Sequence, residues 1–333
     1  MVRPRGLDDI MLAAQLAAAL ELSAFPKPGN VHRLADLGPK TYERFLAGSL
    51  ALGPACRKAA SRGLGVAKGE LEPSSLGLGQ LIEEAIVSDG YWQSSGPTHV
   101  GFALLAIPIS ASAGLALGAS SPDLDIGALR SGVAYLLDNS TVQDALALYR
   151  ALRKSSSSKL GTLRPEAGLP DVFDPSAERW LIEEGLNLKE VLKISSNWDL
   201  VARELYTALE ASVRIGLTRL EDELGEHGSL NTAVVNTYLA LLSELTDTHV
   251  ARAWGLRKTK YIPDAVVEGL EMAEEVSRRA REALELGGAS TPEGLRALYE
   301  MDEWLRSMGL NPGSCADLTA SSLMLALLTW LRP

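Results

Sequence analysis

The stretch from residue 99 to residue 122 contains no Asp, Glu, Lys or Arg. It is long enough to cross a bilayer, but it is rich in Ala, Gly and Ser, contains Pro108 and lacks the flanking basic clusters of a membrane span. A helix that is apolar on all sides is also what the centre of a large helical protein requires. We therefore predict a buried central helix of small residues, and a chain that does not span a membrane.

The remaining sequence also favours helices. Apolar residues make up 46% of the 333 residues, aromatic residues only 5%, and Ala and Leu dominate, which is typical of helices packed through small side chains. No stretch alternates β-branched and polar residues as a half-buried strand would. The sequence predicts an all-α protein with ten or more helices, among them 7–24, 41–61, 76–92, 125–137, 141–152, 197–224, 230–254, 263–286, 291–308 and 314–331.

The best internal linker is the stretch 154–175, which is punctuated by serines, glycines and prolines. It could separate two domains, but the composition does not change across it. We therefore predict a single all-helical domain over residues 1–333, with a surface excursion at about 154–175.

The net charge of −10 argues against a nucleic-acid-binding surface. Cys56 and Cys315 are far apart in sequence and suggest neither a disulfide framework nor a zinc site. No secretory signal is apparent at the N-terminus, so a cytoplasmic protein is expected, and a homodimer is left open.

Four polar segments interrupt this apolar helical pattern. The first follows the stretch 7–24, where two prolines, a glycine and an asparagine stop the helix. The stop places Lys27, Gly29, Asn30, His32 and Arg33 in one short loop, with the cations and flexible backbone that a phosphorylated ligand would need. A simple helix end with solvated charges is the alternative.

The second segment, 96–101, opens the central helix. Thr98 is expected to cap that helix, and His99 to lie in its first turn. A histidine at the start of an uncharged core helix is a candidate proton donor or acceptor. The alternative is a histidine that only satisfies the cap or the core.

The third segment, 246–252, lies within the predicted helix 230–254. If that helix is continuous, His249 and Arg252 share a face, whereas Asp247 lies about 140° from Arg252. Asp247 is a candidate Mg²⁺ ligand or general base, and Arg252 a candidate phosphate contact. A buried ion pair without catalysis is the alternative.

The fourth segment, 309–317, precedes the last helix. Pro and Gly before a helix leave backbone N–H groups free to bind an anion. Asn311, Gly313 and Ser314 are therefore candidate contacts for substrate, and Asp317 falls in the first helical turn. That position also suits the helix dipole without any catalytic role.

Taken in order, these segments resemble the triphosphoribosyl-dephospho-coenzyme A synthase family, and the resemblance covers almost the whole chain. The family's Pro-Lys-Pro-Gly loop and its Asp-Thr-Asn/His segment followed by a basic residue are matched by residues 26–29 and by Asp247, Thr248, His249 and Arg252. Its Asn-Thr-His-Lys-Gly segment is matched by Thr98, His99 and Gly101, with Val100 in place of the lysine. Its closing Asn-Pro-Gly-x-x-Ala-Asp is matched by Asn311, Pro312, Gly313, Ala316 and Asp317.

The resemblance implies an all-α transferase that moves the triphosphoribosyl group of ATP to the 2′-hydroxyl of 3′-dephospho-CoA and releases adenine. Positive charge would develop at the ribose C1′, so Asp247 or Asp317 is expected to stabilise it or to take the hydroxyl proton. Lys27, Arg33 and Arg252 are expected to hold the triphosphate, with Mg²⁺ bridging to Asp247. His99 or His32 is expected to protonate the adenine. These roles follow from side-chain chemistry.

Three other functions remain open at this stage. A family member with another small-molecule acceptor is one, because Val100 and His32 depart from the family pattern. A nucleotide- or coenzyme-binding protein without catalysis is the second. A metal-dependent phosphohydrolase ranks last, because four histidines leave few ligands for a two-metal site.

Overall fold

The computed structural model describes residues 6–93, 96–119, 124–155 and 161–333. The predicted all-α class is confirmed: these residues form helices and isolated bridges, with no named strand among them. The helices are α1 (Leu7–Ser23), α2 (Tyr42–Ala51), α3 (Gly53–Ala67), α4 (Leu78–Tyr91), α5 (Val100–Leu117), α6 (Ile126–Asp138), α7 (Val142–Ser155), α8 (Ala177–Glu183), α9 (Leu188–Ser195), α10 (Leu200–Tyr206), α11 (Thr218–His227), α12 (Leu230–Glu244), α13 (Thr248–Gly255), α14 (Ile262–Glu268), α15 (Leu270–Glu285), α16 (Pro292–Met308) and α17 (Gly313–Thr329).

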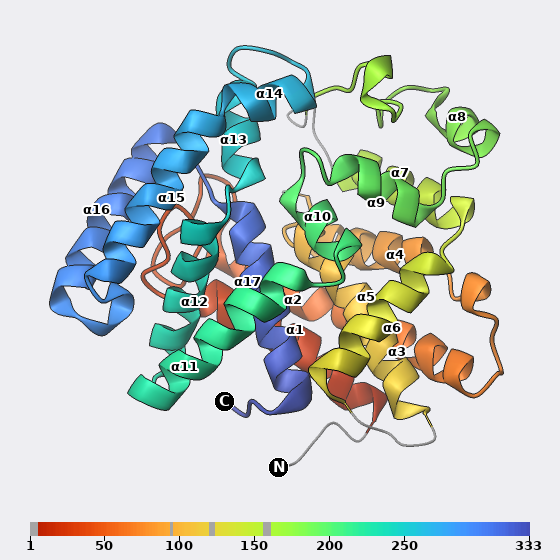
Figure 1. Ribbon diagram of the computed structural model, residues 1–333, viewed down its shortest axis with the longest axis horizontal. Coiled ribbons are helices and arrows are strands. Elements are labelled where there is room, and N and C mark those ends of the chain that lie inside the picture. The colour runs from red at the N-terminus through yellow and green to blue at the C-terminus, as the bar shows by residue number, and fades with distance from the viewer. Residues whose placement is uncertain (1–5, 94–95, 120–123, 156–160) are drawn as a thin grey trace.

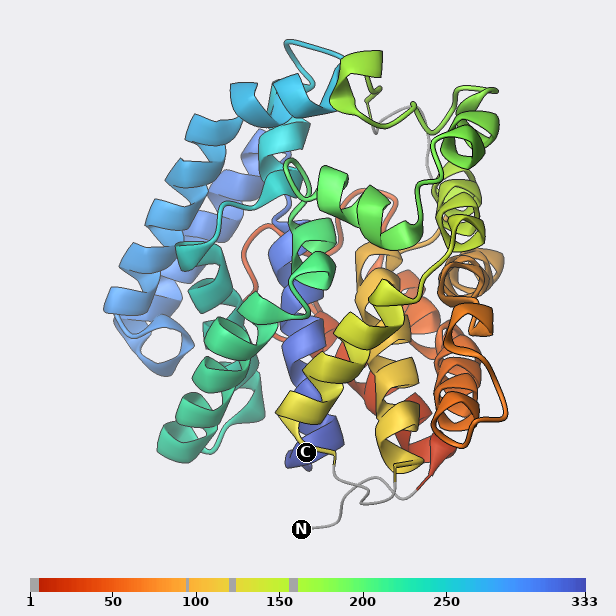
Figure 2. The same ribbon diagram turned by 45° about the vertical axis from the view of Figure 1, so that its right-hand side comes forward.

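Two apolar helices, α5 and α17, form the centre of the molecule. In Figure 1, α17 runs between a group of helices that includes α11, α12, α15 and α16 and a second group that includes α3 to α6. Turning the molecule, as in Figure 2, leaves α17 between these groups, and α5 packs beside it. The two central helices therefore bring their N-terminal ends into the interior.

The uncharged stretch forms the predicted buried helix. All residues of α5 from Phe102 to Gly114 are buried. The helix is long and apolar enough to span a membrane, but 67% of its apolar window is buried inside this fold. Small residues allow α5 to pack this closely against α3. A Cβ on Gly114, for example, would overlap the backbone of Ala60 in α3. The end of the predicted stretch, at 120–122, lies outside the described residues.

Several helices predicted as continuous are divided. The predicted helix 230–254 ends at Glu244 and starts again at Thr248. Asp247 is the N-cap of α13, so the continuous helix on which the predicted angle between Asp247 and Arg252 rested is not formed. The periodicity of apolar residues continues across such a break, which is why the sequence did not reveal it.

Three further divisions have the same origin. The predicted helix 41–61 is divided between α2 and α3, and the predicted helix 263–286 between α14 and α15. The predicted helix 197–224 consists of α10, a π-helix at Ser212–Leu217 and part of α11. Ala208 and Leu209 adopt positive φ between the first two of these elements. The buried carboxylate of Glu204 accepts the backbone N–H groups of Ala211 and Ser212.

The predicted surface excursion is attached to the far side of the molecule. The backbone of Thr162 donates to Lys260 and accepts from Ile262, at 2.8 and 2.9 Å. Arg164 forms an ion pair with Asp264 at 2.8 Å. The segment that follows α7 therefore crosses to the start of α14, as Figure 1 shows at the top, whereas residues 156–160 lie outside the described part of the chain.

Candidate active site

The loop after α1 is held by α16. The N–H of Gly29 donates to Asp302 at 2.7 Å, and Arg306 donates to the carbonyl oxygens of Asn30 and Asp36, both at 2.8 Å. Gly29 has a φ of +74°, and a side chain there would press on Leu305. Asp302 and Arg306 gave no signal in the sequence, because their helix reads as an ordinary solvated face.

His32 and Arg33 belong to this loop and its contacts with α16. His32 is buried beside the Phe25 ring, and one of its ring nitrogens lies 3.4 Å from Arg306. Burial lowers the pKa of His32 to about 4. Arg33 is exposed and lies over Phe25. A pKa this low makes His32 a poor donor of a proton to adenine at neutral pH.

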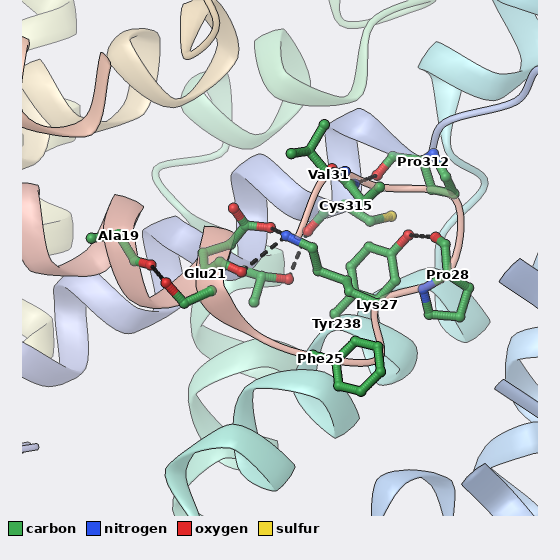
Figure 3. Close-up of polar contacts among 12 residues, drawn as sticks. Ala19, Glu21, Phe25, Lys27, Pro28, Val31, Tyr238, Pro312 and Cys315 are labelled. Atoms are coloured by element: carbon green, nitrogen blue, oxygen red, sulfur yellow. Dashed lines mark hydrogen bonds and ion pairs between the residues drawn. The ribbon is translucent and has the colours of Figure 1, made fainter. Parts of the chain in front are cut away.

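Lys27 is fully buried and paired with a residue of α1. Its amino group donates to the carboxylate of Glu21 and to the Glu21 backbone carbonyl at 2.9 Å. Figure 3 shows the two side chains directed toward each other, with Tyr238 beside them donating to the Pro28 carbonyl. Burial lowers the pKa of Lys27, although Glu21 opposes the shift. This geometry makes Lys27 a counter-ion of Glu21 rather than a free phosphate contact.

Asp247 joins the N-terminal ends of two helices. One oxygen accepts the N–H groups of His249 and Val250, at 2.9 and 3.0 Å, and the other accepts the N–H of Cys315 in α17, at 2.8 Å. Asp247 is fully buried, and burial raises the pKa of its carboxyl. A buried carboxylate at two positive helix ends is well placed to fix α13 against α17.

Asp317 lies where α17 meets the start of α5. A Cβ on Gly101 would overlap one of its carboxylate oxygens, so the absence of a side chain at that position lets the carboxylate approach. Burial and the nearby charges of Glu21, Asp247 and Asp199 raise the pKa of Asp317 well above its usual value. Burial and these carboxylates therefore favour the protonated form of Asp317.

The start of α5 differs from the prediction. His99 is the N-cap residue, and no side chain of Thr98 caps the helix. The carboxylate of Asp89, at the end of α4, instead accepts the N–H groups of Thr98 and His99 at 2.6 and 2.8 Å. Asp89 was missed because a single acidic residue near a helix end is common and carries no spacing signal.

Basic side chains lie at the start of α13. His249 donates through Nδ1 to the carbonyl of Asn311 at 2.8 Å. Burial and the Arg252 charge lower the pKa of His249, and Lys40 contributes in the same direction. Arg252 is 3.6 Å from Asp199, and its side chain is 18% exposed. Lys40, which the sequence did not single out, lies close enough for its charge to act on His249.

The predicted residues of the fourth segment lie against this basic group. A Cβ on Gly313 would stand 2.9 Å from the His249 ring. Ser314 is buried, with its hydroxyl 3.5 Å from that of Thr248, which itself accepts the N–H of Leu200 at 2.8 Å. The side-chain oxygen of Asn311 is buried without a hydrogen-bond partner.

Residues of all four predicted segments therefore converge. The buried acidic cluster, which we define as Glu21, Lys27, Asp247 and Asp317, lies at the N-terminal ends of α5, α13 and α17. It holds three carboxyl groups and one amino group in the protein interior. The first segment contributes Lys27 to the cluster, and Asn30 donates to the carbonyl of Pro312 at 3.3 Å, whereas His32 and Arg33 lie on the α16 side.

The role of Asp247 as a Mg²⁺ ligand stays a prediction. Three backbone N–H groups occupy three of the about four lone-pair sites on its two oxygens, which leaves about one site for an ion that takes oxygen ligands. Within the described ranges, no three His, Cys, Asp or Glu side chains are grouped as a metal site would require. A Mg²⁺ ion that arrives with ATP would be held mainly by the phosphates.

The comparisons with known proteins identify the family. A family model described as ATP:dephospho-CoA triphosphoribosyl transferase matches residues 7–333. A Pseudomonas fluorescens protein, provisionally named 2-(5''-triphosphoribosyl)-3'-dephosphocoenzyme-A synthase, is 34% identical over 124 residues, or 37% of each chain. A Pseudomonas syringae protein with the same provisional name is 29% identical over 34% of this chain and 35% of its own. The matched stretch thus spans about a third of these curated relatives.

A solved structure covers far more of the chain. The Archaeoglobus fulgidus protein, provisionally named triphosphoribosyl-dephospho-CoA synthase, is 27% identical, with a TM-score of 0.58 over 86% of this chain and 99% of its own. The family model extends from the first residue of α1 to the end of the chain. The chain belongs to the ATP:dephospho-CoA triphosphoribosyl transferase family.

Proposed function

We propose that this protein transfers the triphosphoribosyl group of ATP to the 2′-hydroxyl of 3′-dephospho-CoA and releases adenine. The observation that carries the proposal is the buried acidic cluster. In this reaction the bond between ribose C1′ and adenine breaks, and C1′ becomes positively charged before the new bond to oxygen forms. Fixed carboxyl groups in a low-dielectric interior are suited to stabilise such a charge.

Asp317 is the proposed general acid. A buried carboxyl group whose pKa is raised well above its usual value can hold a proton and give it to the departing adenine, and the resulting carboxylate would then face the cationic ribose. This assignment replaces His32, whose pKa of about 4 leaves it neutral. It also gives Asp247 a different role, which is to hold the ends of α13 and α17 in place.

The basic residues at the start of α13 are the proposed triphosphate contacts. Arg252 is partly exposed, and its charge and that of Lys40 both act on His249. The backbone around Gly313 and Ser314 and the side chains of Thr98, Asn30 and Asn311 would line the substrate. Mg²⁺ bound to the triphosphate would neutralise part of its charge. A cytoplasmic location, a homodimer and the absence of nucleic-acid binding stay predictions.

The test measures free adenine. Purified protein is incubated with ATP, Mg²⁺ and 3′-dephospho-CoA, and adenine is followed by chromatography, with CoA as the matched control acceptor. Adenine that appears only with an acceptor present would support the transferase. Measurable ATP binding without adenine release from any acceptor would contradict it and favour a binding protein, while release with another acceptor alone would change the substrate.

A further inference from the structure

The carboxylate of Asp89 fixes the backbone at the start of α5. One of its oxygens accepts the N–H groups of Thr98 and His99, and the other lies 3.2 Å from the Thr98 hydroxyl that donates to it. Asp89 is only 2% exposed. The N–H groups at the start of a helix lack acceptors within the helix, and the carboxylate of Asp89 supplies one. It thereby fixes the backbone from which the His99 side chain projects.

Residues of α2 hold the His99 ring from the other side. Nε2 lies 2.8 Å from the Phe45 carbonyl oxygen and 3.0 Å from the Ser49 hydroxyl, and that hydroxyl itself donates to the same carbonyl at 2.9 Å. A carbonyl oxygen can only accept, so Nε2 must carry the proton. In the neutral ring Nδ1 is then the acceptor.

Gly48 lets these groups come together. A Cβ at this position would overlap Asp89 Oδ1 and would stand 2.5 Å from the Thr98 hydroxyl and 2.9 Å from the His99 ring. The absence of a side chain on α2 therefore allows α2, α4 and the start of α5 to meet at one point. We call Phe45, Gly48, Ser49 and Asp89 the His99 cradle. His99 is 5% exposed within it, so its ring is fixed before any substrate binds.

We propose that Asp89 is a positioning residue that, through the His99 cradle, presents Nδ1 of His99 as the acceptor of the substrate's hydroxyl proton. The proposal rests on the proposed function for the identity of that substrate, whereas the cradle rests on the contacts alone. In the step concerned, the acceptor hydroxyl loses its proton to Nδ1 as its oxygen bonds to C1′, and adenine leaves with the proton from Asp317. This gives His99 the role of a base instead of the predicted acid.

The test compares Asp89→Asn with Asp144→Asn. Asp144 is a matched control because it is 1% exposed and its carboxylate also accepts two backbone N–H groups, those of Gly79 and Thr141, both at 2.8 Å. It contacts the opposite end of α4, about 15 Å away at 1.5 Å per residue. In either variant an amide NH₂ group replaces an acceptor oxygen, so both should lower the melting temperature.

Kinetics and a spectroscopic readout separate positioning from stability. The kcat for adenine release should be at least about tenfold lower in Asp89→Asn than in Asp144→Asn. The KM values of the two variants for ATP should agree within about threefold. In the free protein, ¹⁵N NMR of the histidine rings should find His99 with the proton on Nε2, and Asp89→Asn should alter that signal while Asp144→Asn preserves it.

Two results would overturn the proposal. One is a wild-type His99 that carries its proton on Nδ1, and the other is a pair of variants with equal kcat and equal His99 signals. The NMR measurement needs no substrate. It therefore tests the tautomer that the His99 cradle predicts even if the wild-type protein releases no adenine. The absence of adenine release would count against the proposed function instead.

Discussion

At the scale of single residues, burial decides what each candidate can do. Lys27, His32 and Asp317 are all side chains whose type suggested chemistry. The structure pairs Lys27 with Glu21, lowers the pKa of His32 and raises that of Asp317. The sequence could name these residues, but their protonation depends on neighbours that are distant in the chain.

Asp317→Asn should reduce adenine release by about a hundredfold or more, because an amide cannot donate the proton that the departing base needs. ATP affinity should change little, since Asp317 is not among the proposed phosphate contacts. Rates from chromatography and ATP binding from calorimetry measure the two effects. A variant that keeps wild-type turnover would remove Asp317 from the mechanism.

His32 should make the protein less stable in acid. Its pKa is lower in the folded protein, about 4, than its ordinary value of 6.5, so the unfolded chain binds more protons between these values. The contribution of His32 is therefore complete above about pH 6.5 and is lost as the pH falls toward 4. Urea unfolding of wild type and His32→Gln from pH 4 to 8 should show a steeper loss in the wild type, and parallel curves would contradict the shift.

At the scale of elements, small residues allow the central helices to pack. Gly114 of α5 faces the backbone of α3 so closely that a Cβ would overlap the carbonyl oxygen of Ala60. Backbone cannot move aside as a flexible side chain can. Periodicity predicted both helices, yet it could not show which of their glycines lie in this contact.

Gly114→Ala should lower the free energy of unfolding by about 2 kcal/mol or more, because the two helices must separate to admit the methyl group. Gly65→Ala in α3 is the control, since its Cβ would meet only Leu71 at 3.6 Å, and Ala favours helix over Gly by about 0.5–1 kcal/mol. Denaturant unfolding measures both. Equal effects of the two substitutions would mean that the α3–α5 contact is looser than described.

At the scale of the whole molecule, α1 at one end of the chain packs on α17 at the other, and the excursion after α7 is tied to α14. We expect residues 1–333 to unfold as one cooperative unit, as predicted for a single domain. Circular dichroism and the fluorescence of the tryptophans should then give coincident denaturation curves. Two separated transitions would indicate two domains.

The sequence by itself determined the helical class and the buried central helix, and it named the segments of the candidate site. These depend on local composition and periodicity, which fix what a stretch can bury. Only the tertiary structure decided which polar groups meet. Three examples are the helix that begins after Asp247, the ion pair of Lys27 with Glu21, and the hydrogen bond from the His99 N–H to Asp89. Hydrogen bonds and charge interactions depend on distance in the folded protein, and separation along the chain does not encode that distance.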